Sequence, residues 1–229
     1  MILTIFKINL LIKLVEKQMT GLIYYWSFDY TLNDSKGDAT LFNCDNEKFI
    51  EDRFGQARSA LRLLRGHCLL PSGVYFNGSD YTLTVWIRPR NHGDWPRIIE
   101  IGNGPRQDNV FFTYSEERHY VCFANIQGNK WTENIYSKRP ISRQKLKLNE
   151  WSHLAFVFSN SNNSSIYING TSVYDQLYSF APLNVNRTKN YLGKSSWNND
   201  AYANADFDEL KIYNRALNWS EVLNDMNII

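Results

Sequence analysis

The sequence predicts an all-β fold, a two-sheet antiparallel β-sandwich that ends in a short C-terminal helix. Three observations support this prediction. From position 22 onward the chain consists of short segments in which apolar and polar residues alternate, which is the pattern of strands that bury one face. Turn-forming residues separate these segments, and only the last segment shows the signals of a helix.

Two of the expected strands are especially clear. Segment 81–88 (YTLTVWIR) alternates regularly, whereas 151–158 (WSHLAFVF) is almost continuously apolar, as expected for a strand covered on both faces. Asn169 and Gly170 form a strong hairpin signal, because a type I′ turn needs positive φ at both central positions. The complete set of expected strands is 22–28, 81–88, 97–101, 110–114, 119–124, 151–158, 165–168, 172–174, 190–193 and 206–213.

The C-terminal helix is predicted from its first residues. Asn218 can cap the first turn, and Glu221, three residues later, can reach back to complete a capping box. Val222 and Met226 then lie on the same side of the helix. This is the one helix that we expect in the sandwich.

We expect one domain at 21–229, because no repeat or low-complexity linker divides the chain. A length of 229 residues fits this, since all-β sandwiches often reach about 200–250 residues as a single domain. Residues 1–20 are apolar and basic, and Lys7 and Lys13 interrupt the apolar stretch that a secretory signal requires. We interpret 1–20 as an appendage; a degenerate signal, a membrane-surface helix and a mispredicted start are the alternatives.

The composition excludes several classes of protein. Lys plus Arg (25) nearly balances Asp plus Glu (23), so the chain lacks the basic stripe or tail of a nucleic-acid-binding protein. An aromatic content of 15% argues against disorder. No uncharged apolar run reaches about 18 residues, so no single helix is expected to span a membrane. Membrane contact is therefore expected only if residues 1–20 are retained.

Cysteines and glycosylation triplets bear on the compartment. Three cysteines are too few for a disulfide scaffold, but Cys44 and Cys68 can bridge two loops if the protein is extracellular, and Cys122 is expected to be a small buried hydrophobe. An Asn-rich composition explains the Asn-x-Ser/Thr triplets as well as true acceptor sites do. The candidate asparagines are Asn77, Asn162, Asn163, Asn169, Asn186 and Asn218.

Four phrases in the C-terminal third occur in a characteristic order: WSHLAFVF at 151–158, SIYING at 165–170, YLGKS at 191–195 and FDELKIYNRAL at 207–217. In this order they resemble the laminin-G-like, concanavalin A-like jelly-roll family, and YWSFD at 25–29 and the segment around 54–61 resemble the opening strands of that family. The resemblance implies a jelly roll. It does not imply one function, because the fold hosts lectins, glycosidases, adhesion modules and receptor ectodomains.

Asp208 is a candidate metal ligand. Strict alternation puts Asp208 on the face of Leu210 and Ile212, so it is expected to point inward, where an unpaired carboxylate would be too costly. Its partner is expected to be an arginine or backbone N–H groups, or else a structural calcium ion of the kind that related jelly rolls often hold. Asp29, after the first strand, would then be a second ligand.

The sequence predicts a protein without catalytic activity. Glucanases of the resembling family carry an E-x-D-x-E pattern that places three carboxylates on one strand face, and this chain has no such string. Asp206 and Asp208 come nearest, but alternation puts Glu209 on the opposite face. The motifs of serine hydrolases, zinc proteases and nucleotide-binding loops are also absent from the sequence.

The predicted function is recognition of carbohydrate, or of a glycosylated or protein partner, by an extracellular or cell-surface module. Aromatic and amide side chains in three expected loops are the candidates for the binding site. The alternatives are a glycoside hydrolase with an atypical site, or an adhesion or receptor-ectodomain module that binds protein only. The candidate residues are Trp95, Trp131, Trp197, Asn198, Asn199, Asp200 and Tyr202.

Overall fold

The computed structural model describes residues 20–128, 141–160, 163–177 and 180–227. The expected appendage at 1–20 falls outside this range except for Thr20, and the candidates Trp131 and Asn162 also lie outside it. Among the described residues, no helix has the length and apolar character needed to cross a membrane.

The described chain forms twelve strands and one helix, α3, at Trp219–Met226. Every strand pairs antiparallel with its neighbours. The strands are β1 (Leu22–Trp26), β2 (Phe42–Ile50), β3 (Ala60–Leu70), β4 (Tyr81–Pro89), β5 (Arg97–Gly102), β6 (Val110–Thr113), β7 (Cys122–Asn125), β8 (Ser152–Phe158), β9 (Asn163–Ile168), β10 (Thr171–Leu177), β11 (Lys189–Leu192) and β12 (Ala203–Tyr213).

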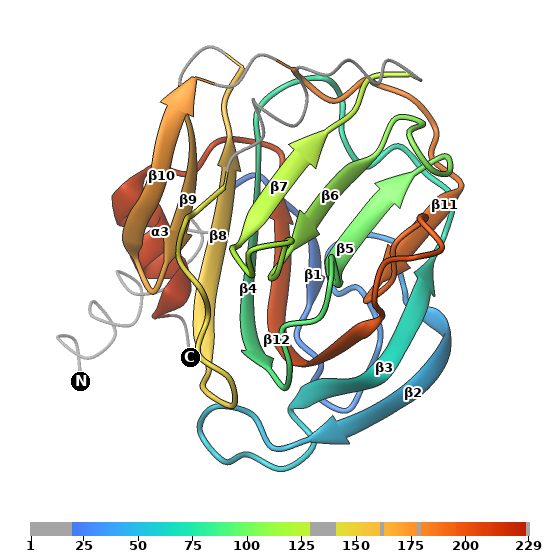
Figure 1. Ribbon diagram of the computed structural model, residues 1–229, viewed down its shortest axis with the longest axis vertical. Helices are drawn as coiled ribbons and strands as arrows, with labels where there is room; N and C mark the ends of the chain where they lie inside the picture. The colour runs from blue at the N-terminus through green and yellow to red at the C-terminus, as the bar shows by residue number, and fades with distance from the viewer. Residues whose placement is uncertain (1–19, 129–140, 161–162, 178–179, 228–229) are drawn as a thin grey trace, which may run out of the picture.

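The strands form one hydrogen-bonded path that curls into two layers, in the order β10-β9-β8-β4-β12-β3-β11-β5-β6-β7. Figure 1 shows β5, β6 and β7 lying in front of β4 and β12, with β11 and β3 side by side at the edge. Strand β3 passes between the layers, because its first half pairs with β12 and its last residues pair with β11. The predicted two-sheet antiparallel sandwich is therefore confirmed.

The core lies between the layers and is rich in large apolar side chains from both of them. Phe112 of β6 and Phe123 of β7 face Phe156 of β8, with ring centroids 5.1 and 6.0 Å from Phe156. Trp26 is fully buried, and its indole N–H donates to the Ala39 carbonyl at 2.9 Å. Burial of aromatic rings of this size contributes much of the stability of such a sandwich.

Two predicted local features are confirmed. Asn169 and Gly170 both have positive φ (50° and 74°) at the turn between β9 and β10. At α3, the Asn218 side chain accepts from the Glu221 backbone N–H, and the Glu221 side chain accepts from the Asn218 backbone N–H. The capping box is therefore complete.

Strand β2 was not predicted, and its sequence shows why. Most of its side chains are exposed, and FNCDNEKFI has no apolar alternation. Pairing with β3 and the disulfide between Cys44 and Cys68 hold it in the sheet. The structure thus contains the predicted disulfide but places it between two paired strands, not between two loops.

A β-bulge in β12 corrects the prediction that Asp208 points into the core. The register with β4 shifts between Asp208 and Lys211, and Glu209 lies in the left-handed region with φ 52°. Figure 1 shows β12 changing direction part-way along its length. Because the extra residue resets the alternation, Phe207 and Leu210 both enter the core. Asp208 instead faces outward with Trp86, its partner on β4.

Candidate binding site

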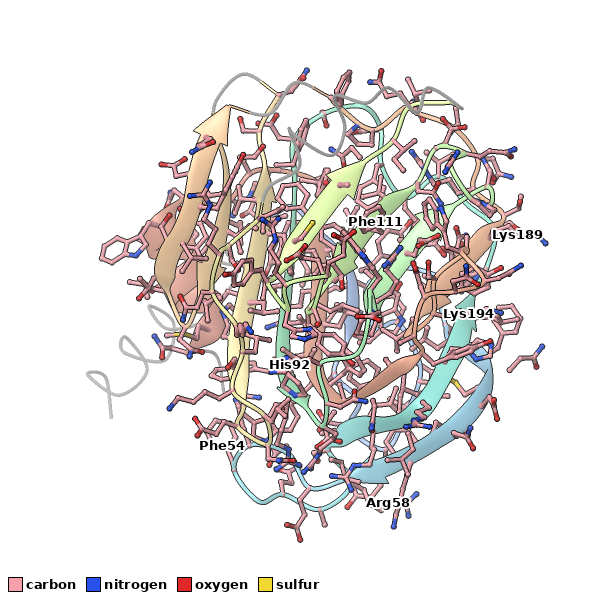
Figure 2. All side chains as sticks on the ribbon, in the orientation of Figure 1. Phe54, Arg58, His92, Phe111, Lys189 and Lys194 are labelled. Atoms are coloured by element: carbon pink, nitrogen blue, oxygen red, sulfur yellow. A yellow bond between two sulfur atoms is a disulfide. The ribbon has the colours of Figure 1, made fainter. Side chains whose placement is uncertain are left out.

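Three aromatic side chains gather on the outer side of the front layer, and we call Trp95, Phe111 and Trp197 the aromatic face. Phe111 comes from β6, whereas Trp95 and Trp197 come from the segments before β5 and after β11. Both indole rings meet the Phe111 ring edge to face, with centroids 6.4 and 6.1 Å away. Figure 2 labels Phe111 on this layer and Lys194 toward the β11 side.

The aromatic face is built over the guanidinium group of Arg97, which is 2% exposed. Its Cζ lies 4.4 Å from the Phe111 ring centroid and 5.5 Å from that of Trp197, within the range of cation–π attraction. Its three nitrogen atoms donate to Glu100 Oε2 (2.9 Å), the Trp95 carbonyl (2.6 Å) and Asp200 Oδ2 (2.8 Å). One buried side chain therefore ties together the two segments that carry the tryptophans.

A second set of hydrogen bonds fixes the segment around Trp197. Ser195 Oγ donates to Asp200 Oδ2 at 2.7 Å and accepts from the Trp197 backbone N–H at 3.1 Å. Glu100, on β5, accepts from the Ser196 backbone N–H and from Asn109 Nδ2. Most polar groups of this network have a partner, so it fixes the loop at little cost in desolvation, although the buried Ser196 Oγ has none among the described residues.

A small pocket of about 100 Å³ adjoins the Trp197 side of the aromatic face. Lys194 Nζ lies 5.0 Å from the Tyr191 ring centroid and 5.8 Å from that of Tyr202. Asp200 Oδ1 has no hydrogen-bond partner among the described residues, so it can accept from a ligand hydroxyl. The pocket is lined by Lys194, Ser195, Trp197, Asn198, Asp200 and Tyr202.

Most of the predicted ligand residues come together here. Trp95 and Trp197 share the aromatic face, and Asn198, Asp200 and Tyr202 line the pocket. Asn199 is exposed and next to the pocket in sequence, but it does not line it.

Sequence reasoning missed Phe111, Arg97 and Lys194. Arginine and phenylalanine within expected strands look like ordinary sheet residues. Only the pairing of β5 with β6 places Glu100 opposite Phe111 and brings Arg97 to the same outer face.

Asp208 has an arginine partner. Arg53, from the segment after β2, donates to Asp208 Oδ2 and lies over the Trp86 ring, with Cζ 4.8 Å from the centroid. Burial raises the pKa of Asp208 to about 7; Glu209 adds to this rise, and Arg53 opposes it.

The predicted calcium ligands do not form a metal site in the described part of the chain. Asp29 is exposed, and no group of three or more His, Cys, Asp or Glu side chains gathers there in a metal-binding arrangement. The residues present fit an ion pair between Arg53 and Asp208 better than a calcium ion. Calcium binding stays a prediction, and it is tested by measuring the midpoint of thermal unfolding as calcium is added.

The described glycosylation candidates lie at the surface. Asn77, Asn169, Asn186 and Asn218 are all exposed. Asn163 belongs to β9, but its side chain is not described. Modification at these positions stays a prediction.

The antiparallel sandwich and its outer aromatic site define the class of the protein as a jelly-roll domain with a candidate recognition surface. A family model described as the concanavalin A-like lectin/glucanases superfamily, of the laminin G type, matches residues 65–223. The chain belongs to this superfamily. Among curated proteins, none matches the chain in sequence.

Several solved structures share the fold. Domain 4 of AbnA, a GH43 extracellular arabinanase from Geobacillus stearothermophilus, in complex with arabinotriose, is 20% identical with a TM-score of 0.71, covering 89% of this chain and 97% of that one. A structure of botulinum neurotoxin type C, which interacts with two ganglioside molecules, is 12% identical with a TM-score of 0.66, covering 93% and 52%.

A third similar structure is the binding domain of botulinum neurotoxin DC in complex with rat synaptotagmin II. It is 15% identical with a TM-score of 0.65, covering 91% of this chain and 51% of that one. The chain thus spans about half the length of the toxin domains that it resembles. At these identities the likeness shows the fold, and carbohydrate-binding and protein-binding domains both use it.

Proposed function

We propose that this protein is a non-catalytic, extracellular carbohydrate-binding module that holds a sugar at the aromatic face and its adjoining pocket. The observation that carries the proposal is the convergence of Trp95 and Trp197 on Phe111, fixed from below by Arg97. Ring faces of this kind bind the apolar C–H side of a sugar. The partly buried indoles are held in place before a ligand arrives, so little ordering cost falls on binding.

The pocket supplies the polar half of such a site. Asp200 Oδ1, the exposed Asn198 amide and the Lys194 ammonium group lie beside Trp197 and can bind sugar hydroxyls. The arabinanase domain supports the sugar class, because it has the same fold over nearly its whole length and was solved with arabinotriose.

The experiment compares two tryptophan variants on a glycan array. Trp197→Ala removes a ring of the aromatic face, whereas Trp219→Ala removes a 58% exposed ring from α3, away from this site. We expect Trp197→Ala to weaken binding of the best glycan at least about tenfold, by analogy with aromatic anchors elsewhere, and Trp219→Ala to leave it unchanged. Equal binding by both variants would reject this site.

A glycoside hydrolase is the second candidate, and one observation favours it. The bulge in β12 brings Asp208 and Glu209 close enough to interact, and the pKa of Asp208 is raised to about 7, which suits a general acid. Incubation with a panel of polysaccharides would distinguish the candidates. If the wild type forms product and Asp208→Asn does not, the protein is a glycoside hydrolase and not only a binding module.

The third candidate is a module that binds protein only; a toxin binding domain of this fold was solved in complex with rat synaptotagmin II. Capture of a partner protein before and after enzymatic deglycosylation separates this candidate from a lectin. Capture that survives deglycosylation, together with a blank glycan array, would favour it.

A further inference from the structure

Charged side chains form a row across the outer face of the other layer. Lys48 of β2 lies opposite Arg62 of β3, Arg62 lies opposite Asp206 of β12, and Asp206 lies opposite Arg88 of β4. Side chains directly opposite each other in antiparallel strands project from the same face. Four neighbouring strands therefore bring three cations and one carboxylate into line.

Asp206 is the centre of this row and is fully buried. It accepts from Arg62 Nε and Nη2 at 2.6 and 3.1 Å, from Arg88 Nε at 2.7 Å and from Arg90 Nε at 3.0 Å. These hydrogen bonds lower the pKa of Asp206 in spite of its burial, so it is ionised at neutral pH. We call Arg62, Arg88 and Arg90 the arginine cluster.

The arginine cluster carries more positive charge than Asp206 can balance. Three guanidinium groups share one carboxylate, whereas one bidentate arginine is enough to pair a buried carboxylate. The nearby Asp208 is already paired with Arg53. Glu47 and Glu51, on and after β2, form no ion pair with the cluster among the described residues.

Several N–H groups of the cluster are open to a ligand. Arg88 uses only Nε in its hydrogen bonds with described residues, and Arg62 leaves Nη1 without such a partner. The three side chains are 22–26% exposed. Arg88 also lies over the Trp151 ring, with Cζ 4.7 Å from the centroid, which fixes the plane of its guanidinium group.

We propose that the arginine cluster binds the sulfate or carboxylate groups of an acidic glycan. The planar fork of arginine matches these oxyanions. Neighbouring strands lie about 4.8 Å apart, so the row from Lys48 to Arg88 extends over roughly 14 Å. That length suits successive anionic groups of a polymer better than a single free ion. This site is on the other layer and does not depend on the aromatic face.

Nucleic acid is the less suitable polyanion. Proteins that bind duplex DNA typically neutralise about 6–10 phosphates, whereas the proposed site consists of Lys48 and the arginine cluster. Single strands are held by stacking of bases on aromatic rings, but the Trp151 ring of this region is covered by Arg88. A single-stranded DNA oligonucleotide is therefore included in the test.

The test is calorimetric titration of the protein with four probes: a heparin oligosaccharide, a hyaluronan oligosaccharide, dextran and the DNA oligonucleotide. We expect both acidic glycans or one of them to bind, dextran not to bind at this site, and affinity to fall as salt increases. The relative affinities for the heparin and hyaluronan oligosaccharides show whether sulfate or carboxylate is preferred. No binding of either acidic glycan at low salt, or tighter binding of DNA, would overturn the proposal.

Matched variants locate the site. Arg88→Gln and Lys189→Gln each remove one positive charge. Lys189 is an exposed residue of β11, and Figure 2 shows it at the opposite side of the molecule from Phe54. We expect Arg88→Gln to weaken acidic-glycan binding about tenfold, the size of one charge-assisted contact, and Lys189→Gln to change it little.

Arg88→Lys keeps the charge but loses the fork, so an intermediate loss is expected. Thermal unfolding of each variant checks that the fold is intact, and Arg88→Lys carries the test if Arg88→Gln does not fold. Acidic-glycan binding that is equal in the wild type and in the folded Arg88 variants would contradict the assignment.

Discussion

Arginine is used in opposite ways on the two outer faces of the sandwich. At the aromatic face, one fully buried arginine, Arg97, has two carboxylate partners, Glu100 and Asp200. In the arginine cluster, three partly exposed arginines share the single carboxylate of Asp206. The balance of charge and burial separates a guanidinium group that supports a site from guanidinium groups that can bind a ligand.

The largest expected effect comes from removing the buried arginine. Arg97→Met leaves Glu100 without its ion-pair partner and should lower the free energy of unfolding by about 3–5 kcal/mol. Arg88→Met leaves Asp206 with two arginines, so its cost should be about 1 kcal/mol or less. Urea unfolding of both variants checks the difference; equal losses would break the comparison between the faces.

Removing carboxylates should reverse that order. Asp206→Asn deprives three guanidinium groups of the one carboxylate that they share among the described residues and should cost about 3 kcal/mol. Asp200→Asn should cost only about 1 kcal/mol, because Arg97 keeps Glu100. Chemical denaturation of the two variants gives both values. A larger loss for Asp200→Asn would contradict the assignment of Asp206 as the counter-charge on which the arginine cluster depends.

The pH dependence of stability sharpens the contrast along β12. The folded-state pKa of Asp208 is raised to about 7, above the ordinary value of 3.8 for an aspartate, so the native state binds this proton more tightly than the unfolded state. The stabilisation from this proton is fully present below about pH 4 and is lost as the pH rises toward 7, with a slope of at most about 1.4 kcal/mol per pH unit.

Asp208→Asn removes this titration. As the pH rises from about 4 to 7, the wild type should therefore lose free energy of unfolding relative to Asp208→Asn. Unfolding curves measured across that range give the difference directly. A difference that does not vary with pH would contradict the raised pKa of Asp208.

A small effect on both stability and affinity is expected at Ser195. Ser195→Ala removes the hydrogen bonds to Asp200 and to the Trp197 backbone N–H and should cost about 1 kcal/mol. Glycan affinity should fall severalfold, because Trp197 loses an anchor. Ser172→Ala, at an exposed position on β10, is the control; the same affinity in both variants would mean that this anchor does not position Trp197.

Much of the fold could be predicted from the sequence, because burial of one face leaves a period of two in the strands. Strand β4 alternates in this way, and Asn169-Gly170 marked the hairpin between β9 and β10. Strand β2 left no such pattern, because it is exposed and held by its pairing and the disulfide. The bulge at Glu209 could not be predicted either, since no glycine marks the residue with positive φ.

The candidate site was predictable only in part. The aromatic and amide side chains around Trp197 share one short segment, so composition alone indicated them. Arg97 and Phe111 are brought to them by strand pairing, and the arginine cluster depends on register across β3, β12 and β4. Contacts of that kind are fixed by tertiary structure, which local sequence patterns do not record.

The most direct test of the proposed function follows the indole N–H signals of the tryptophans by NMR while the best array glycan is added. The signals of Trp95 and Trp197 should shift in a saturable way, and those of Trp26, Trp86 and Trp219 should stay in place. Saturable shifts confined to tryptophans outside the aromatic face would contradict the proposal that sugar binds there.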